Sequence, residues 1–177
     1  MKQLNLIGRD PRRYDGFAYG NASVRDIAAP NRFFITASQT GGAPRLIAEH
    51  VVRVDAWDAQ RFEVEATGSR APSSESISHG MVYAADASIV WIMHVHSPSI
   101  WRAAARLDLP VTAQDVPYGS PAMAQAVAEL TRCHVARPLV FATLGHEDGV
   151  FACGGSADDT GAALVRVLTS ALAGSAR

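Results

Sequence analysis

One apolar segment, residues 89–96, constrains the fold of this chain most. Its first five residues are all apolar, so both faces of a strand formed by them would be apolar, and the segment ends in His94-Val95-His96. A short run of this kind is typical of a strand that is covered on both sides, so we expect a central strand here. Residues i and i+2 of a strand point to the same face, so His94 and His96 present two imidazoles to one side. Such a pair is able to bind a metal ion.

Short strand-like and helix-like segments fill the rest of the sequence. The β-type runs cover residues 32–36, 46–54 and 61–66, and turn-forming stretches at 41–42, 55–58 and 68–69 separate them as in antiparallel sheets. Helical spacing of apolar residues predicts helices over 73–85, 120–132 and 157–173, and a strand pair is expected over 139–143 and 150–153. Strands and helices do not alternate regularly as in a doubly wound fold. The pattern therefore predicts an α+β layered sandwich in which helices flank one sheet.

The N-terminal segment has a different character. Residues 8–16 are polar, rich in turn formers and without a helical apolar stripe, so we expect an ordered arm or loop that can form part of a substrate mouth. The 177 residues, 48% of them hydrophobic, can bury the core of one domain. We therefore expect a single domain over residues 1–177, with residues 1–19 as an N-terminal arm.

Charge and cysteine content narrow the classes of function. The 16 basic and 17 acidic residues are scattered and leave a formal net charge of −1, so no electrostatic footprint of nucleic acid or of an anionic membrane is present. Cys133 and Cys153 form neither a CxxC pair nor a disulfide framework. No signal peptide and no run of about 18 apolar residues is recognisable. These features predict a cytoplasmic protein that acts on a small, soluble substrate.

A third histidine lies 50 residues after the pair, in the sequence Gly145-His146-Glu147-Asp148-Gly149. We expect the two glycines to let the backbone turn sharply and deliver His146 to a site built elsewhere. Three imidazoles can hold zinc at about 2.0–2.1 Å. The alternatives are a chance pair of buried histidines and a solvated turn histidine. The other histidines are interpreted as ordinary surface, core or helix-packing residues: His50, His134 and His79.

Polar residues precede the first predicted helix, in the sequence Pro72-Ser73-Ser74-Glu75. Glu75 in the first helical turn is explained either by helix stabilisation, worth roughly 0.3–1 kcal/mol, or by a role as catalytic base. Ser73 and Ser74, and likewise the turn around Asn21, are able to form an anion site, although simple capping explains them equally well. Ser38 lies in a third small polar loop, which by itself is a weak signal.

Six motifs follow one another along the chain. They lie at residues 20–25 (GNASVR), 35–38 (ITAS), 72–75 (PSSE, followed by His79 and Tyr83), 94–97 (HVHS), 118–121 (YGSP) and 146–150 (HEDGV). In this order they resemble the class II aldolase/adducin family. The resemblance covers most of the chain.

The resemblance implies a fold and a site. The fold is a three-layer α/β/α sandwich around a mainly antiparallel sheet. The site is a zinc-type divalent ion held by His94, His96 and His146, with Glu75 as the catalytic acid/base. The resemblance also implies assembly as a homotetramer or another homo-oligomer. We consider Trp57 and Trp101 as exposed apolar candidates for such an interface, although single exposed aromatic residues are ordinary on monomers too. The residues implied for a phosphate pocket are Asn21, Ser38, Ser73 and Ser74.

Several positions depart from the family pattern. Gln39 stands where a glycine usually follows the serine of the second motif, and two carboxylates, Glu147 and Asp148, follow His146. A bound phosphate is disfavoured by such carboxylates. The segments that supply tyrosine acids in familiar relatives are short or missing, so another residue must take that role. The candidates are Tyr14, Tyr19, Tyr118 and Asp148, each of which has packing or turn formation as its alternative.

The favoured hypothesis is a metal-dependent lyase that performs aldol cleavage of a small hydroxy-carbonyl compound, phosphorylated or not. A dication stabilises the enediolate that forms when the C–C bond breaks. Zn²⁺ is the expected ion, and Mn²⁺, Co²⁺ and Fe²⁺ suit similar ligands. An epimerase or decarboxylase acting through the same metal chemistry remains open, as does a non-catalytic scaffold like the adducin head. The presence of three histidines and Glu75 favours the enzyme.

Overall fold

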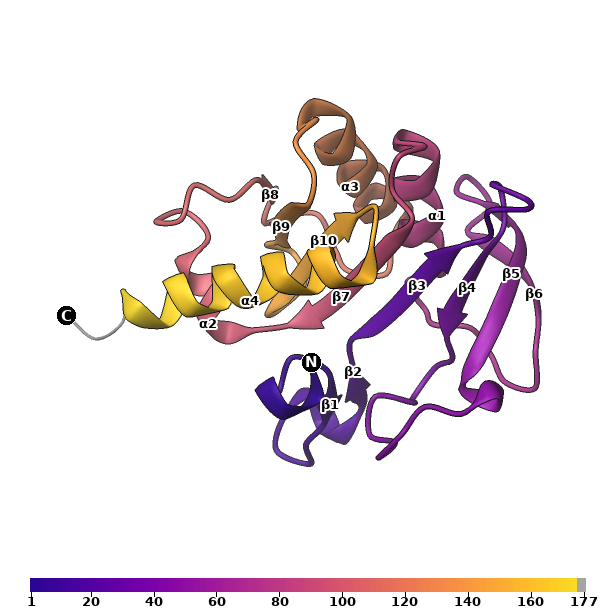
Figure 1. Cartoon of the computed structure of the whole chain (residues 1–177), viewed down its shortest axis with the longest axis horizontal. Coiled ribbons are helices and arrows are strands. Elements are labelled where there is room, and N and C mark those ends of the chain that lie inside the picture. The colour runs from indigo at the N-terminus through magenta and orange to yellow at the C-terminus, as the bar shows by residue number, and fades with distance from the viewer. Residues whose placement is uncertain (175–177) are drawn as a thin grey trace.

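An eight-stranded mixed sheet forms the centre of the protein in the computed structural model, which describes residues 1–174 (Figure 1). The strand order is β6-β5-β4-β3-β7-β10-β9-β8, and every neighbouring pair is antiparallel apart from β8 and β9. The strands are β3 (Asn21–Arg25), β4 (Phe33–Thr36), β5 (Val51–Asp58), β6 (Glu63–Thr67), β7 (Trp91–His96), β8 (Val111–Thr112), β9 (Leu139–Thr143) and β10 (Gly149–Gly154).

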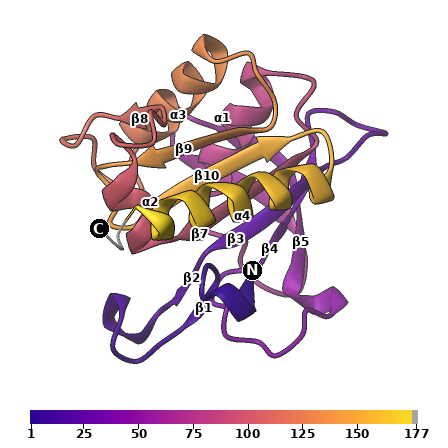
Figure 2. The ribbon, with the colours of Figure 1, turned by 60° about the vertical axis from the view of Figure 1, so that its left-hand side comes forward.

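Four α-helices cover the two faces of this sheet, as Figure 2 shows. One face carries α1 (Ser76–Ala85) and α3 (Pro121–Cys133), which contact each other, and the other carries α2 (Pro98–Ala103) and α4 (Ala157–Ala173). The result is the predicted three-layer α/β/α sandwich around a mainly antiparallel sheet. None of the described helices is long and apolar enough to cross a lipid bilayer.

Two apolar cores hold the layers together, one on each side of the sheet. Alternation along β10 divides its side chains between them, because Phe151 and Cys153 join the core under α1 and α3 whereas Val150 and Ala152 join the core under α2 and α4. Ile92 of β7 belongs to the α1/α3 core. His94 and His96 therefore continue the same face of β7, towards the end of the sheet.

Side-chain caps explain where three of the helices begin. Ser97, Ser120 and Ser156 each accept a hydrogen bond from a backbone N–H in the first turn of α2, α3 and α4. Proline follows the serine in the first two cases, where its missing N–H costs nothing. The cap of α2 comes directly after His96. The central strand and the next helix are thus joined without a loop.

The N-terminal arm is ordered. It contains the short helical turn η1 (Lys2–Leu4), the strands β1 (Gly8–Arg9) and β2 (Ala18–Tyr19), which pair with each other, and the turn η2 (Tyr14–Gly16) between them. In Figure 1 this arm lies at the end of the sheet where β3 begins and β7 ends. The division into one domain with an arm over residues 1–19 stays a prediction.

The structure corrects several predicted boundaries. The expected break at residues 55–58 is absent because β5 continues to Asp58, and the strand expected from residue 46 begins only at Val51, after the helical turn η3 (Ala48–His50). Three elements of the structure are not predicted by the sequence pattern: the strand β3, the helix α2 and the parallel edge strand β8. Strand β3 was missed because its sequence, NASVR, is largely polar. Asn21 at the start of β3 lines the site described below.

The two tryptophans proposed for an oligomer interface are half-buried within the chain. Trp57 packs against the α1/α3 core and lies so close to Gly80 that a Cβ atom there would be 2.6 Å from the indole. Trp101 packs against the other core and donates a hydrogen bond from Nε1 to the carbonyl of Thr143 at 3.1 Å. Intramolecular packing therefore accounts for both residues.

Candidate metal centre and active site

A cavity of about 560 Å³ opens where β3 begins, β7 ends and α1 begins. Its walls come from the N-terminal arm, from the loops after β4 and β9, and from the segment before α1. Seven of the eight residues named as site candidates line it: Asn21, Ser38, Ser73, Ser74, Glu75, His96 and His146. The eighth, His94, is fully buried beside them.

Strand register brings part of this set together. Asn21 of β3 lies directly opposite His94 of β7, and Gly149 at the start of β10 lies opposite His96. Paired residues on antiparallel strands share a face of the sheet. The loop that precedes β10 and carries His146 is therefore held beside the His94/His96 end of β7.

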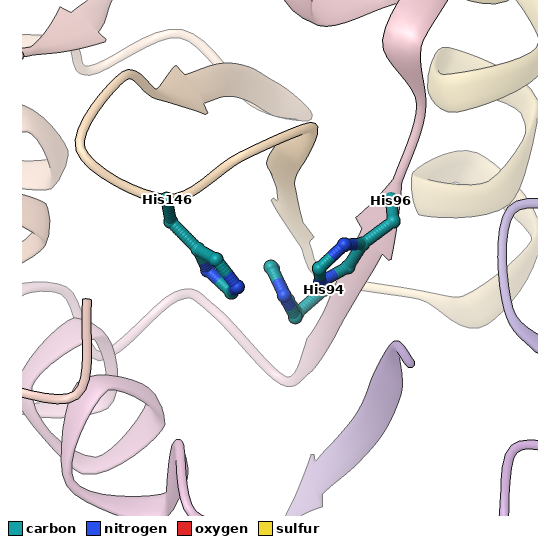
Figure 3. Close-up of side chains that lie close together, drawn as sticks. All are labelled: His94, His96 and His146. Atoms are coloured by element: carbon teal, nitrogen blue, oxygen red, sulfur yellow. The ribbon is translucent and has the colours of Figure 1, made fainter. Parts of the chain in front are cut away.

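The three histidines converge on one point. Each offers a ring nitrogen, and these nitrogens lie within 4.8 Å of one another. Figure 3 shows the ring of His146 reaching from its loop towards the rings of His94 and His96 on the strand. The ring centroids of His94 and His146 are 5.1 Å apart, and those of His96 and His146 are 4.7 Å apart. Side chains that the sequence separates by 50 residues thus form one cluster.

This donor set fits a divalent transition-metal ion. The ligand nitrogens of a tetrahedral zinc ion are roughly 3.4 Å apart, so small side-chain adjustments would bring the cluster into coordination geometry. Nδ1 of His94 and Nδ1 of His96 are buried without a hydrogen-bond partner, and Nε2 of His94 contacts the carboxylate of Glu75. Unpartnered imidazole nitrogens in an apolar setting are costly, and a coordinated ion would satisfy those directed at it.

Glu75 contacts two of the three histidines. Its Oε2 lies 3.0 Å from Nε2 of His94, and its Oε1 lies 3.3 Å from Nδ1 of His146. Asn21 donates a hydrogen bond from Nδ2 to the same Oε2 at 2.8 Å. The carboxylate is thus fixed at the centre of the cluster, within reach of a bound ion and of a substrate.

Burial and charge set the protonation of these groups. Burial alone would raise the pKa of Glu75, but the charge of His94 and the hydrogen bond from His146 hold that pKa well below its usual value. Burial lowers the pKa of His94, against the opposing effect of Glu75. Burial and the neighbouring His94 lower the pKa of His96 to about 2. The lowered pKa values of His94 and His96 favour the neutral imidazoles that metal binding requires.

The loop that carries His146 turns differently from the expectation. The residue with the left-handed backbone is Asp148, at φ 62°, and neither Gly145 nor Gly149 has a positive φ. The glycines serve close packing instead. A Cβ on Gly145 would lie 1.7 Å from the carbonyl oxygen of Val116, and one on Gly149 would lie 2.4 Å from Oγ1 of Thr143. The expectation that glycine flexibility makes this turn was wrong.

The hydroxyl and amide candidates have distinct surroundings. The helix α1 begins at Ser76 without a side-chain cap, so the expectations that Ser73 and Ser74 cap it and that Glu75 lies in its first turn were wrong. Ser73 Oγ instead accepts a hydrogen bond at 3.3 Å from the N–H of Glu75, the residue before the helix. Ser74 Oγ lies 3.4 Å from the hydroxyl of Tyr118, and Ser38 also lines the cavity. Asn21 is committed to Glu75 through Nδ2. Intramolecular hydrogen bonds to Glu75 thus already involve Ser73 and Asn21, two of the four residues expected to bind substrate.

The four residues considered for the second acid all lie near the histidines. Tyr14 and Tyr19 pack their rings against His96, and Tyr118 stacks on His146 with ring centroids 4.3 Å apart. Asp148 accepts a hydrogen bond from the hydroxyl of Tyr14 at 2.6 Å. Tyr14, Tyr19 and Tyr118 also line the cavity.

His79, which the sequence predicts to be a helix-packing residue, belongs to a buried chain of polar side chains. The side chain is fully buried, and its Nδ1 lies 2.7 Å from Oγ of Ser23, which in turn lies 2.7 Å from the hydroxyl of Tyr83. Its Nε2 is buried without a partner. The motif that contains Glu75, His79 and Tyr83 was the available signal, because these residues share one side of α1 at spacings of four residues.

Acidic pH is expected to destabilise the metal-free protein through His79. Burial lowers the pKa of His79 to about 3. The folded pKa thus lies below the unfolded value of about 6.5, so this stabilisation is present above pH 6.5 and is lost as the pH falls towards 3. We expect His79 to account for a loss of about 2 kcal/mol in unfolding free energy between pH 7 and pH 5.

Urea unfolding of the chelator-treated protein at the two pH values measures this effect. His79→Gln keeps a group that can bond Ser23 but does not titrate in this range. Between the two pH values, the unfolding free energy of the variant should fall less than that of the wild type. The remaining decrease would come from the other histidines. An identical loss in both proteins would contradict the assignment.

The sequence of this chain matches a known protein family. The profile of the Class II Aldolase and Adducin N-terminal domain matches residues 10–172. The chain belongs to this family. No curated protein sequence matches it at a significant level.

Several solved structures share the fold of this class II aldolase domain. An L-fuculose 1-phosphate aldolase matches with a TM-score of 0.65 and 21% identity, over 86% of this chain and 72% of that one. The L-fuculose-1-phosphate aldolase of Thermus thermophilus matches with a TM-score of 0.62 and 22% identity, over 97% and 85% of the two chains. YgbL of Klebsiella pneumoniae, whose description leaves aldolase, epimerase and decarboxylase open, matches with a TM-score of 0.63 and 20% identity, over 86% and 75%.

These similarities establish the class II aldolase fold. The family and the similar structures also indicate the general class of function, which is an enzyme of the aldolase or epimerase type. Class II aldolases use a divalent metal, and the three-histidine cluster lies where this chain can hold one.

Proposed function

We propose that this protein is a divalent-metal-dependent lyase that cleaves a carbon–carbon bond in a small hydroxy-carbonyl compound by aldol chemistry. The observation that carries the proposal is Glu75 in contact with both His94 and His146 at the wall of an open cavity. Three imidazoles and a carboxylate in this arrangement combine a metal site with a proton-transfer group. Zn²⁺ is the ion we favour, and Mn²⁺, Co²⁺ and Fe²⁺ suit similar ligands.

The residues proposed for the metal are His94, His96 and His146. When bound, a divalent ion supplies a Lewis acid that stabilises negative charge on the carbonyl and hydroxyl oxygens of the substrate. His94 is fixed by the strand pairs on both sides of β7, and His146 by the tight packing of its loop. Rigid support of this kind is what a preorganised site requires.

Glu75 is the proposed acid/base. In the cleavage direction it accepts the proton of the substrate hydroxyl as the carbon–carbon bond breaks, and it or a neighbouring acid returns a proton to the enediolate. The hydrogen bond from Asn21 at 2.8 Å orients the carboxylate for this transfer. The ionised carboxylate is the form that accepts a proton.

Substrate contacts are proposed for four residues that line the cavity: Asn21, Ser38, Ser73 and Ser74. Asp15 and Glu147 line the cavity too, whereas no Lys or Arg belongs to the described lining. Uncompensated carboxylates repel a phosphate dianion. We therefore favour a hydroxy-carbonyl substrate without a phosphate group over a sugar phosphate.

An epimerase or decarboxylase using the same centre is the second proposal, because the fold neighbour YgbL leaves these activities open. All three reactions need stabilisation of charge on an oxygen next to the reacting carbon. Identification of the products separates them. We further propose a cytoplasmic location and a homo-oligomeric assembly, a tetramer by analogy with the family.

Hydrogen–deuterium exchange provides the first test, since it detects enediolate formation without knowledge of the natural substrate. The zinc-loaded protein is incubated in D₂O with small hydroxy-ketones, with dihydroxyacetone and its phosphate as a matched pair, and the carbon-bound protons are followed by NMR. We expect protein-dependent exchange that stops on chelation and is faster for the unphosphorylated compound. Absence of exchange with every ketone would favour the scaffold alternative, and faster exchange of the phosphate would favour a phosphate pocket.

A further inference from the structure

The N-terminal arm forms part of the wall around the histidine cluster. The ring of Tyr14 meets that of His96 edge-on, with centroids 4.5 Å apart. Tyr19 lies behind it, with its ring centroid 5.1 Å from that of Tyr14. Gln39 ties the arm to the sheet, because its Oε1 accepts a hydrogen bond from the N–H of Ala18 at 2.9 Å. The arm is thus in direct contact with a proposed metal ligand.

A side-chain hydrogen bond joins the arm to the loop that carries His146. The hydroxyl of Tyr14 donates to Oδ2 of Asp148 at 2.6 Å, between residues that are 134 positions apart in the chain. Arg13 donates from Nη2 to the Tyr14 hydroxyl at 2.6 Å, and the same nitrogen lies 3.8 Å from Oδ2 of Asp148. Asp148 is only 7% exposed. A carboxylate with so little exposure needs such partners, and both come from the arm.

Asp148 is connected to both ends of the histidine cluster. Its carbonyl oxygen accepts a hydrogen bond at 2.8 Å from the N–H of Ser97, the residue after His96. The N–H of the next residue, Gly149, donates to the carbonyl of His146 at 2.9 Å. The left-handed backbone at Asp148 fixes this short turn. The position of the Asp148 side chain therefore affects the backbone next to two proposed ligands, His96 and His146.

We propose that Tyr14 is a positioning residue of the metal centre, which holds the His146 loop through Asp148 and confines the ring of His96. The inference rests on the proposed function, because it requires that the histidines bind a divalent ion. Groups outside the coordination sphere that orient the ligands raise metal affinity by fixing the geometry in advance. In this chain that support comes from an arm that is remote in sequence from all three histidines.

This assignment differs from the role of second acid considered from the sequence. The Tyr14 hydroxyl already donates its proton to Asp148 and accepts one hydrogen bond from Arg13. Both interactions hold the group in place and leave it no free proton to offer to a substrate. Tyr14 thus acts through Asp148 and His96.

Removal of the Tyr14 hydroxyl is the direct test. Tyr14→Phe keeps the aromatic ring beside His96 and removes the hydrogen bond to Asp148, so we expect Zn²⁺ affinity to fall about 10-fold, the lower end of the effect of outer-shell substitutions. Asp148→Asn should weaken affinity similarly, and the double variant should bind little more weakly than either single one. Competition with a chromogenic chelator measures affinity on the full-length, metal-free protein.

The visible spectrum of the Co²⁺-substituted protein provides a readout of ligand geometry, and the band positions should shift in Tyr14→Phe. Arg12→Ala is the matched control, because Arg12 pairs with Asp10 at the exposed side of the arm. It should leave affinity and spectrum unchanged. Thermal unfolding of each metal-free variant shows whether the fold survives, and Asp148→Asn supplies the test if Tyr14→Phe does not fold.

The two proposals fail in different ways. The first outcome is that the wild type binds Zn²⁺ and that Tyr14→Phe and Asp148→Asn both keep the wild-type affinity and Co²⁺ spectrum. This result would overturn the positioning role but would still support the metal centre. A wild type that binds neither ion would overturn the metal centre and the positioning role together.

Discussion

Replacement of His146 with alanine is expected to abolish stoichiometric metal binding while the fold survives. His146 lies on a loop at the cavity and is only half-buried, so its loss leaves the two apolar cores intact. Removal of one of three imidazole ligands should weaken Zn²⁺ binding by more than the roughly 10- to 100-fold that loss of an outer-shell partner costs. Elemental mass spectrometry after dialysis should change from about one ion per chain to almost none.

His94→Ala should have the same effect on metal content, at a greater cost in stability because His94 is fully buried. His134→Ala is the matched control. That histidine lies at the end of α3 and bonds the carbonyl of Leu130 through Nδ1 at 2.9 Å, so its loss should not change the metal content. Circular dichroism confirms the fold of each variant. Stoichiometric metal in either His146→Ala or His94→Ala would contradict the proposed ligand set.

Glu75→Gln is expected to reduce proton exchange in the dihydroxyacetone assay by about 10²- to 10⁴-fold, the usual contribution of a general acid–base group. The amide has the size of the carboxylate but cannot accept the proton. Asn21 can still reach the side-chain oxygen of glutamine, so the local packing should persist. The exchange rate at saturating ketone is the quantity to compare, because loss of proton transfer lowers kcat.

Two measurements accompany this variant. Its metal content must be determined in parallel, since Glu75 lies 3.0 Å from His94 and 3.3 Å from His146 and is able to contact the ion. Rates are then compared at equal metal occupancy. Glu129→Gln, on the exposed side of α3, is the control for loss of a carboxylate and should exchange at the wild-type rate. A metal-loaded Glu75→Gln protein with the wild-type rate would exclude Glu75 as the base.

The central strand illustrates what a local pattern can determine. The apolar run before His94 predicted a covered strand, and the alternation of side chains placed both histidines on one face, as the structure confirms. The helical spacing of apolar residues predicted α3 and α4 correctly for a similar reason. These are short-range effects, in which the residues that determine the structure lie within a few positions of one another.

The site itself depended on contacts between distant segments. The pairing of Asn21 with His94 places a polar strand, missed in the sequence, beside the histidines. Ser23, His79 and Tyr83 form a buried chain that helical spacing alone did not distinguish from ordinary packing. A polar residue in a core-facing position is explained only by its partner, and the partner here belongs to another element.

By itself, the sequence determined the layered class, the central strand, the family resemblance and the residues that converge at the cavity. It determined these because periodicity, caps and ordered motifs are properties of neighbouring residues. Only the tertiary structure decided that Tyr14 meets Asp148, that Asn21 orients Glu75 and that Gly145 is required by the carbonyl of Val116. Each of these contacts joins segments far apart in the chain, and strand register and packing bring such segments together.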